Sequence, residues 1–420
     1  MTTGRVEERL RALPPDWMLV PLGDLPLQSP VGYGITRPGP HVDHGVGMLR
    51  ATDIQGGRVR PDQARHVSDQ VDRANERSRI GVGDVLVVMV GRVGEAAVVT
   101  EEFAGWNISR TIGRVSLREA GPVDPAWLAA WLNSSYVRTW CAQRATGSTL
   151  QRTLNLAALR ELPVPVPPRA QALEFLRLMT VMDEKAQVDA EIVGTAPAVA
   201  DAWFRTEAAE GLRRAPFGEL ARISVGVRMR PHPEGREPAG PSVPVVAPAD
   251  ILQSELAHLG DTGTGQVVTE DVPLCPPGSL LVAVREGGVR VVVNDVAVVP
   301  GRGVLVLEPW SEDDRYWLLH AIRCHALELA STAQGSAGRE ISHRAFAGAA
   351  VPWAPAEVRA RFAAVAGRLH GRARTAAQEV STLAALREVL LEEFLATGAA
   401  PSRGGPAHGG GVQEGLFVME

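Results

Sequence analysis

Small polar and cationic residues gather in one short stretch of the sequence, from Thr146 to Arg152. Glycine lets a backbone approach a ligand closely. Serine and threonine hydroxyls suit phosphate oxygens, whereas glutamine and arginine can also hydrogen-bond the edges of nucleic-acid bases. The alternative is a solvated loop in front of a helix. We predict a binding loop made of Thr146, Gly147, Ser148, Thr149, Gln151 and Arg152.

A related stretch, Gln-Gly-Ser-Ala-Gly-Arg, lies about 190 residues further along, at positions 334–339. We predict binding roles there for Gly335, Ser336 and Arg339. A second rank of candidates consists of Arg92, Asn107 and Arg110. For these three residues, a surface or capping role is the alternative to contact with a ligand.

Residues that could perform catalysis or hold a metal are sparse. Asp53 and Asp250 each precede an isoleucine at a strand-to-loop junction, where a turn-capping role suits aspartate better than acid catalysis. His41 and His44 supply only two ligands, so we predict no metal site. Lys185 is the only lysine, and it lies outside any Walker A loop. The sequence also lacks HExxH, GxSxG and Asn-Pro-Pro-Tyr motifs, and we therefore predict a chain that is not an enzyme and has no cofactor of its own.

The composition is typical of a protein with two or three globular domains. The chain has 420 residues, of which 45% are hydrophobic, and no apolar run is long enough to cross a membrane. Three distant cysteines suggest neither a zinc knuckle nor a disulfide framework, so we expect a reduced, cytoplasmic protein. The net charge of -5 disfavours a general nucleic-acid coat but is compatible with recognition by local arginines.

The sequence contains an internal duplication. Short fragments recur in the same order about 195 residues apart, as Gly83-Asp-Val-Leu86 and Gly278-Ser-Leu-Leu281 illustrate. Apolar runs predict buried strands in both halves: Val85 to Val90, Ala96 to Thr100, Leu280 to Val284 and Val289 to Val293. A helix is predicted late in each half, at Trp127 to Thr139 and at Tyr316 to Leu329.

Each half ends in a long helix with apolar residues at spacings of three and four. The first predicted seam is Phe175, Leu178, Met182, Lys185, Asp189, Ile192, Ala196, Val199 and Trp203. The second is Val358, Phe362, Val365, Leu369, Arg372, Ala376, Glu379, Leu383, Leu386 and Leu390. Such spacing favours a coiled-coil partner over an ordinary amphipathic helix. We expect a kink or short break near Gly194 and Pro197.

Charges inside the two seams predict how the helices pair. In an antiparallel pair, Lys185 meets Glu379 and Asp189 lies within one turn of Arg372, so that opposite charges face each other. A parallel pair at the repeat offset brings like charges together, which is costly in a desolvated seam. The alternative is that all four side chains point into water. We predict the antiparallel arrangement.

This organisation resembles the specificity subunits of type I restriction-modification systems. The local motifs that agree are Trp17 before Leu22-Gly-Asp-Leu25, Arg50-Ala-Thr-Asp-Ile-Gln-Gly56, Gly83-Asp-Val-Leu86, Gly91-Arg-Val-Gly94, Leu162 to Pro168 and Met182-Asp-Glu-Lys185. The resemblance extends from about Trp17 to Leu395 and is weaker in the second half, where Ser279 replaces the aspartate of the Gly-Asp motif.

The resemblance implies an α+β fold class: two mixed α/β target recognition domains joined by two long helices that form an antiparallel coiled coil, in a pseudo-twofold repeat. The expected ranges are target recognition domains at 1–168 and 208–355, spacer helices at 169–207 and 356–397, and a disordered tail at 398–420.

The resemblance also implies a function. Each target recognition domain would read one half of a split site in double-stranded DNA. The helices would space the domains and dock adenine methyltransferase subunits, and an ATP-dependent restriction subunit can join. S-adenosylmethionine and ATP would belong to those partners. The alternative is a protein-binding scaffold or decoy with no DNA-reading role.

Overall fold

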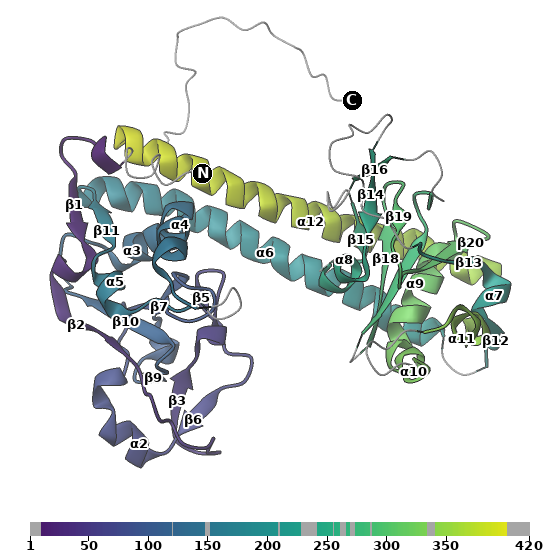
Figure 1. The fold of residues 1–420 in the computed structure, drawn as a ribbon, viewed down its shortest axis with the longest axis horizontal. Helices are drawn as coiled ribbons and strands as arrows, with labels where there is room; N and C mark the ends of the chain where they lie inside the picture. The colour runs from purple at the N-terminus through teal and green to yellow at the C-terminus, as the bar shows by residue number, and fades with distance from the viewer. Residues whose placement is uncertain are drawn as a thin grey trace, which may run out of the picture. The chain divides into compact units, whose positions relative to one another are not determined.

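The computed structural model describes residues 10–119, 121–147, 152–208, 211–227, 242–254, 256–260, 266–268, 274–285, 288–333 and 341–400. These residues form two compact units. Unit 1 comprises Met1–Asp183 and Ala384–Glu420, and unit 2 comprises Glu184–Leu383. Two long helices, α6 (Arg169–Glu207) and α12 (Ala356–Thr397), each contribute one part to each unit (Figure 1).

Unit 1 is built on an antiparallel sheet in the order β2-β10-β7-β8. The strands form there because β7 is an unbroken run of buried Val and Leu, which suits a strand covered on both faces. The strands of unit 1 are β1 (Met18–Pro21), β2 (Leu27–Tyr33), β3 (Val46–Leu49), β4 (Ile54–Gln55), β5 (Arg58–Val59), β6 (Arg65–Val67), β7 (Val85–Val88), β8 (Ala96–Val98), β9 (Asn107–Ile108), β10 (Ile112–Leu117) and β11 (Pro163–Val166). Its shorter helices are α2 (Asp69–Ala74), α3 (Pro125–Leu132), α4 (Ser135–Arg144) and α5 (Leu156–Arg160).

Unit 2 is built on a sheet in the order β13-β20-β17-β18-β15. Its strands are β12 (Arg213–Pro216), β13 (Ala221–Val225), β14 (Ser242–Val246), β15 (His258–Leu259), β16 (Gln266–Val268), β17 (Leu280–Arg285), β18 (Gly288–Asn294), β19 (Val299–Pro300), β20 (Leu305–Pro309) and β21 (Ala350–Trp353). Its shorter helices are α7 (Phe217–Leu220), α8 (Pro248–Gln253), α9 (Asp314–Cys324), α10 (Ala326–Ser331) and α11 (His343–Gly348).

The two units repeat the same topology. The sheet order β2-β10-β7-β8 of unit 1 matches β13-β20-β17-β18 of unit 2 strand for strand. A smaller sheet with one antiparallel and one parallel pairing recurs as β6-β3-β9 and β16-β14-β19. The antiparallel pair β1-β11 likewise recurs as β12-β21. The predicted duplication is therefore confirmed at the level of topology.

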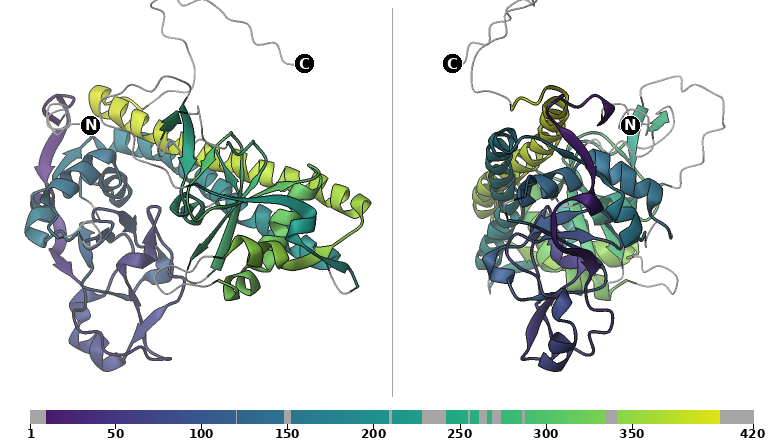
Figure 2. Two further views of the ribbon diagram at one scale, coloured as in Figure 1. Left: turned by 45° about the vertical axis from the view of Figure 1, so that its right-hand side comes forward. Right: turned by 90° about the vertical axis from the view of Figure 1, so that its left-hand side faces the viewer.

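The long helices run antiparallel within each unit (Figures 1 and 2). In unit 1, Phe175 of α6 stacks on Phe394 of α12 with ring centroids 4.4 Å apart. In unit 2, Lys185 of α6 binds Glu379 of α12, and Arg372 lies 3.4 Å from Asp189. The predicted opposite-charge contacts are confirmed, and the parallel arrangement is excluded.

Other details of the helix predictions were wrong. Val199 and Leu386 of the predicted seams are 56% and 44% exposed, while the neighbouring Ala200 is fully buried. The buried face differs from a strict heptad because each helix packs on its own globular domain as well as on the other helix. Helix α6 also continues through Gly194 and Pro197, so the predicted short break is absent, while a kink there stays a prediction.

The two late helices predicted within the domains are each divided. In unit 1, α3 ends at Leu132 and the Ser134 side chain caps a new helix by accepting a hydrogen bond from the Val137 N–H. In unit 2, His325 separates α9 from α10. Among the described helices, none has the length and apolar character needed to span a membrane.

Candidate nucleic-acid interface

Several of the predicted binding residues lie at one end of the main sheet of unit 1. At this end β7 finishes at Val88 and β10 begins opposite it at Ile112. Strand β2 finishes at Tyr33, which pairs with Gly113 of β10. The loops after β2 and β7 and the loop before β10 therefore meet at the same end of the sheet.

The predicted Gly-Ser loop is attached at this end by backbone hydrogen bonds. Thr146 and Thr153 bind each other through both of their N–H groups, at 2.9 and 2.8 Å. The Gly91 N–H donates to the Arg152 carbonyl at 2.9 Å. Thr146, Gly147 and Arg152 are exposed beside the β7–β8 turn, whereas Ser148, Thr149 and Gln151 lie outside the described residues.

The β7–β8 turn needs its two glycines. Gly91 and Gly94 have φ values of 86° and 92°, a region that side chains with a Cβ rarely adopt. Between them, Arg92 donates to the Ile54 carbonyl at 2.6 Å and pairs with Glu95 at 3.1 Å. Part of the charge of Arg92 is thus neutralised, and its contacts hold the turn against the β4–β5 hairpin.

Arg110 projects from the tight turn that leads into β10. The turn closes with a 3.0 Å hydrogen bond from the Ile112 N–H to the Ser109 carbonyl. The Arg110 N–H donates to the Ile35 carbonyl at 2.9 Å, which ties the turn to the end of β2. The Arg110 side chain is exposed.

Asn107 is placed differently from the other candidates, because its side chain is fully buried. Its amide donates to Asp72 at 2.8 Å, and its carbonyl oxygen accepts from the Ser78 hydroxyl at 2.5 Å. Hydrogen bonds from Arg79 to Asp72 hold the pKa of that carboxyl below its ordinary value. Asn107 therefore fixes α2 against β9 and has no surface with which to touch a ligand.

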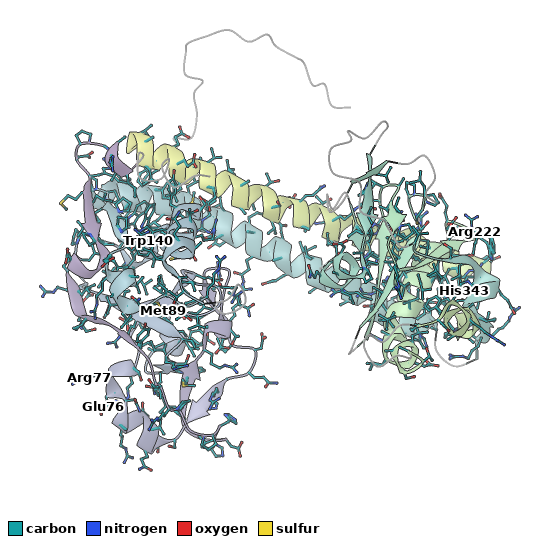
Figure 3. All side chains as sticks on the ribbon, viewed as in Figure 1. Glu76, Arg77, Met89, Trp140, Arg222 and His343 are labelled. Carbon is teal, nitrogen blue, oxygen red and sulfur yellow. The ribbon has the colours of Figure 1, made fainter. Side chains whose placement is uncertain are left out.

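Two cationic features near these loops were not predicted from the sequence. A groove of 420 Å³ beside the end of β2 is lined by the side chains of Tyr33, Arg73, Asn75 and Arg77, together with the acidic Glu76. Arg77 lies at this margin of unit 1, whereas Met89 lies inside the domain (Figure 3). At the end of α4, the Arg144 guanidinium lies 4.2 Å from the Trp140 ring, just before Thr146. An arginine beside an aromatic ring that is not fully buried, such as Trp140, suits phosphates and stacked bases.

In unit 2, the predicted loop residues Gly335, Ser336 and Arg339 lie outside the described residues. The predicted turn-capping roles of the two aspartates are confirmed. Asp53 accepts the Arg50 N–H at 2.7 Å, and Asp250 accepts the Ala247 N–H at 2.8 Å. Both carboxylates are thus used inside the fold, in equivalent places of the two units.

The described residues hold neither a cluster of metal ligands nor a thiol of lowered pKa. Within them, no group of three or more His, Cys, Asp and Glu side chains is placed to hold a metal ion. Burial raises the pKa of the Cys141 thiol to about 12 and that of Cys275 to about 11, so neither thiol forms a nucleophilic thiolate near neutral pH. What this surface offers is exposed guanidinium, hydroxyl and backbone donors at the end of a rigid sheet.

Comparisons with known proteins agree with this architecture. The chain is 32% identical over 166 residues to the type I restriction enzyme EcoBI specificity subunit of Escherichia coli. The match covers 39% of this chain and only 34% of that relative. No protein-family model matches the chain.

Solved structures agree over a longer range. The crystal structure of a type I restriction-modification system S subunit from M. genitalium superposes with a TM-score of 0.55 at 14% identity, over 90% of this chain and 96% of that one. The HsdS subunit from Thermoanaerobacter tengcongensis gives a TM-score of 0.36 at 18% identity, over 92% of this chain and 98% of that one. The resemblance to type I specificity subunits, first seen in the motifs, is therefore confirmed in sequence and in fold.

Proposed function

We propose that this chain is the sequence-reading, non-catalytic subunit of a type I restriction-modification complex. Its two globular domains, at 1–168 and 208–355, would each read one half of a bipartite site in double-stranded DNA. The observation that carries this proposal is the cluster of exposed polar loops at one sheet end of unit 1, on a topology that unit 2 repeats. The similarity to the EcoBI specificity subunit supports it.

The chemistry of the loop cluster fits DNA. Backbone phosphates are bound by arginine, hydroxyl and backbone N–H donors, and base edges are read by arginine and glutamine. Arg110, Arg152 and Thr146 supply such donors from loops that a rigid sheet holds in place. The net charge of the chain, -5, does not oppose this, because binding depends on the few positive side chains that lie next to the DNA and not on the charge of the whole chain.

The long helices would dock adenine methyltransferase subunits, with an ATP-dependent restriction subunit as a further partner. Apolar side chains on the helices support a protein partner. In unit 1, Val181 is 60% and Val389 58% exposed, and in unit 2 Val188 is 53% exposed. Val181 and Val188 are two helical turns apart on α6 and so lie on the same face, where exposed apolar side chains suit contact with another protein. S-adenosylmethionine and ATP would be bound by the partners.

The test of this function is a methylation map. Long-read sequencing should find methyladenine at one bipartite motif when the chain is expressed with its methyltransferase partner. The motif should disappear when the gene for the chain is deleted. If the map is unchanged, or if the purified complex binds no DNA, the scaffold or decoy function replaces the proposal.

A single residue tests the reading surface. Arg152→Ala should weaken binding of the cognate site by about 1–3 kcal/mol, or relax one base of one half-site, if its guanidinium contacts a base. Arg118→Ala is the matched control, because Arg118 is an exposed arginine beyond the opposite end of β10. Equal behaviour of the two variants would remove Arg152 from the interface.

A further inference from the structure

Arg302 of unit 2 occupies the same structural position as Arg110 of unit 1. Each arginine is the second residue of a turn that leads into β10 or β20, which occupy the same place in the two main sheets. The turn of Arg110 closes from Ile112 N–H to Ser109 carbonyl at 3.0 Å. The turn of Arg302 closes from Val304 N–H to Gly301 carbonyl at 3.1 Å.

The two turns share backbone hydrogen bonds to the strands beside them. Ser109 donates to the Leu49 carbonyl, and Gly301 donates to the Val246 carbonyl, both at 2.8 Å. In each unit the chain just after β2 or β13 also passes very close to the backbone of the turn. A Cβ on Gly34 would meet the Ile108 carbonyl oxygen at 1.8 Å, and one on Gly226 would meet the Gly301 carbonyl oxygen at 2.0 Å.

Only glycine fits such a crossing, so both turns are fixed in place by the backbone. The arginine side chains themselves are left available. Both are exposed, and in the described parts of the chain neither guanidinium has a hydrogen-bond or ion-pair partner.

The residues flanking the arginine differ between the units. Unit 1 has Ser109-Arg110-Thr111, and unit 2 has Gly301-Arg302-Gly303. Two domains that read different half-sites need different base contacts, whereas contacts to phosphate carry no sequence information and can be the same in both. A residue that stays the same while its neighbours change therefore suits the shared contact.

We propose that Arg110 and Arg302 form a matched pair of backbone-phosphate contacts, one for each half-site, which position the two domains on DNA without reading its sequence. This inference rests on the proposed function and assigns a role within it. This role differs from that of Arg152, because Arg110 and Arg302 would contact phosphates whereas Arg152 would contact a base.

The experiment uses the complex of the full chain with its methyltransferase partner. Affinities are measured between 50 and 200 mM salt for a duplex with the mapped site and for one with both half-sites scrambled. Arg110→Gln and Arg302→Gln should each weaken both duplexes by the same factor, roughly fivefold to tenfold at 0.1 M salt. Each should reduce the slope of log affinity against log salt by about 0.9, the value of one released counterion. The methylated sequence should stay unchanged.

Matched controls lie at the opposite ends of the same sheets. Arg118→Gln in unit 1 and Arg222→Gln, whose side chain pairs with Glu308 in unit 2, should leave the salt slope unchanged. Arg302→Lys keeps the charge and should bind nearly as the wild type does, which separates loss of a phosphate contact from misfolding.

Two outcomes overturn the inference. An unchanged slope for Arg302→Gln means that it touches no phosphate, and an altered base at one half-site means that it reads sequence. Failure of the wild-type complex to prefer the mapped duplex refutes the proposed function instead. The slopes on the scrambled duplex still report whether the two arginines contact phosphate.

Discussion

Trp127 in unit 1 and Trp317 in unit 2 occupy equivalent places, and each indole donates a hydrogen bond to a proline carbonyl, of Pro165 or Pro352. Each ring also packs on one phenylalanine from each long helix. In unit 1 these are Phe175 and Phe394, and in unit 2 they are Phe362 and Phe204. The same aromatic cluster therefore joins a globular domain to the helix pair in both units.

Beside this shared cluster, the two units differ in chemistry. In unit 1, Leu391 precedes Phe394 by three residues in α12, and its side chain is buried. The equivalent residue in unit 2 is Asp201, which precedes Phe204 by three residues in α6. The Asp201 carboxylate binds His320 at 2.6 Å and Arg323 at 2.7 Å. His320 in turn contacts His370 of α12 at 3.0 Å.

The same topology therefore accepts either apolar or polar packing where a globular domain meets the helix pair. Unit 1 uses apolar packing, which needs no particular protonation state. Unit 2 uses a chain of buried polar groups, and every member must keep its partner because an orphaned buried charge is costly.

The largest effect is expected at the shared tryptophans. Trp127→Ala and Trp317→Ala should each cost about 3–5 kcal/mol of unfolding free energy, since each removes a fully buried ring and leaves a cavity. Hydrogen exchange resolved by peptide, with increasing urea, reads each unit separately. A much smaller loss in one unit would show that the two joints are not equivalent.

Asp201→Ala should lower the stability of unit 2 by about 3 kcal/mol, because His320 and Arg323 lose their anionic partner in the interior. The control is Asp183→Ala in unit 1, which removes a partly exposed pair with Arg387 and should cost less than about 1 kcal/mol. The same peptide-resolved exchange measures both. Equal losses would mean that the polar chain of unit 2 has no special role.

The buried histidines predict a pH dependence that unit 1 should not share. Burial lowers the pKa of His370 to about 3, and it also lowers the pKa of His320 and His258. His370 faces His320 and Tyr316 of α9 and His258 of β15, with Arg323 and Asp201 nearby. The positive charge of Arg323 and any charge on His320 or His258 oppose protonation of His370 more than the Asp201 carboxylate favours it.

The free energy of unfolding depends on pH because the folded and unfolded states bind different numbers of protons. The folded state binds fewer protons than the unfolded state wherever the pH lies between about 3 and the ordinary histidine pKa of about 6.5. The stability of unit 2 is therefore complete above about pH 6.5 and is lost as the pH falls, by about 2 kcal/mol at pH 5 from His370 alone. Urea unfolding at pH 7 and pH 5 measures this. A His370→Leu variant should flatten the dependence, and an unchanged slope in that variant would contradict the assignment.

The sequence predicted those parts of the fold whose signals are local or repeated. Val85 to Val90 and Leu280 to Val284 are apolar runs, and they form β7 and β17 nearly as expected. The antiparallel register was predictable because Lys185 and Glu379 carry opposite charges inside apolar seams. The candidate loop residue Thr146 pairs with Thr153, the residue after Arg152, and the binding role of Thr146 and Arg152 stays a prediction.

The remaining features depend on partners that are distant in sequence. Asn107 is buried because Asp72 and Ser78, 35 and 29 residues away, satisfy its amide. The role of His320 needs Asp201 and His370, which come from two other helices. Arg302 could have been found by aligning Gly301-Arg302-Gly303 with Ser109-Arg110-Thr111, but only the matching hydrogen bonds make that alignment compelling.

The smallest effect is expected for the charges that set the helix register in unit 2. Lys185 binds both Asp189 and Glu379, and Arg372 approaches the same two carboxylates. The side chains of Lys185 and Glu379 are 47% and 40% exposed, so water and salt screen most of their attraction. Lys185→Glu places three carboxylates together and should lower the melting temperature at low salt. Adding Glu379→Lys should restore much of it, because the exchange recreates an opposite pair only if the helices are antiparallel in this register. The melting temperature at low and at high salt measures both variants, and a double variant no more stable than Lys185→Glu alone would show that the pairing in unit 2 is held by its apolar residues without help from these charges.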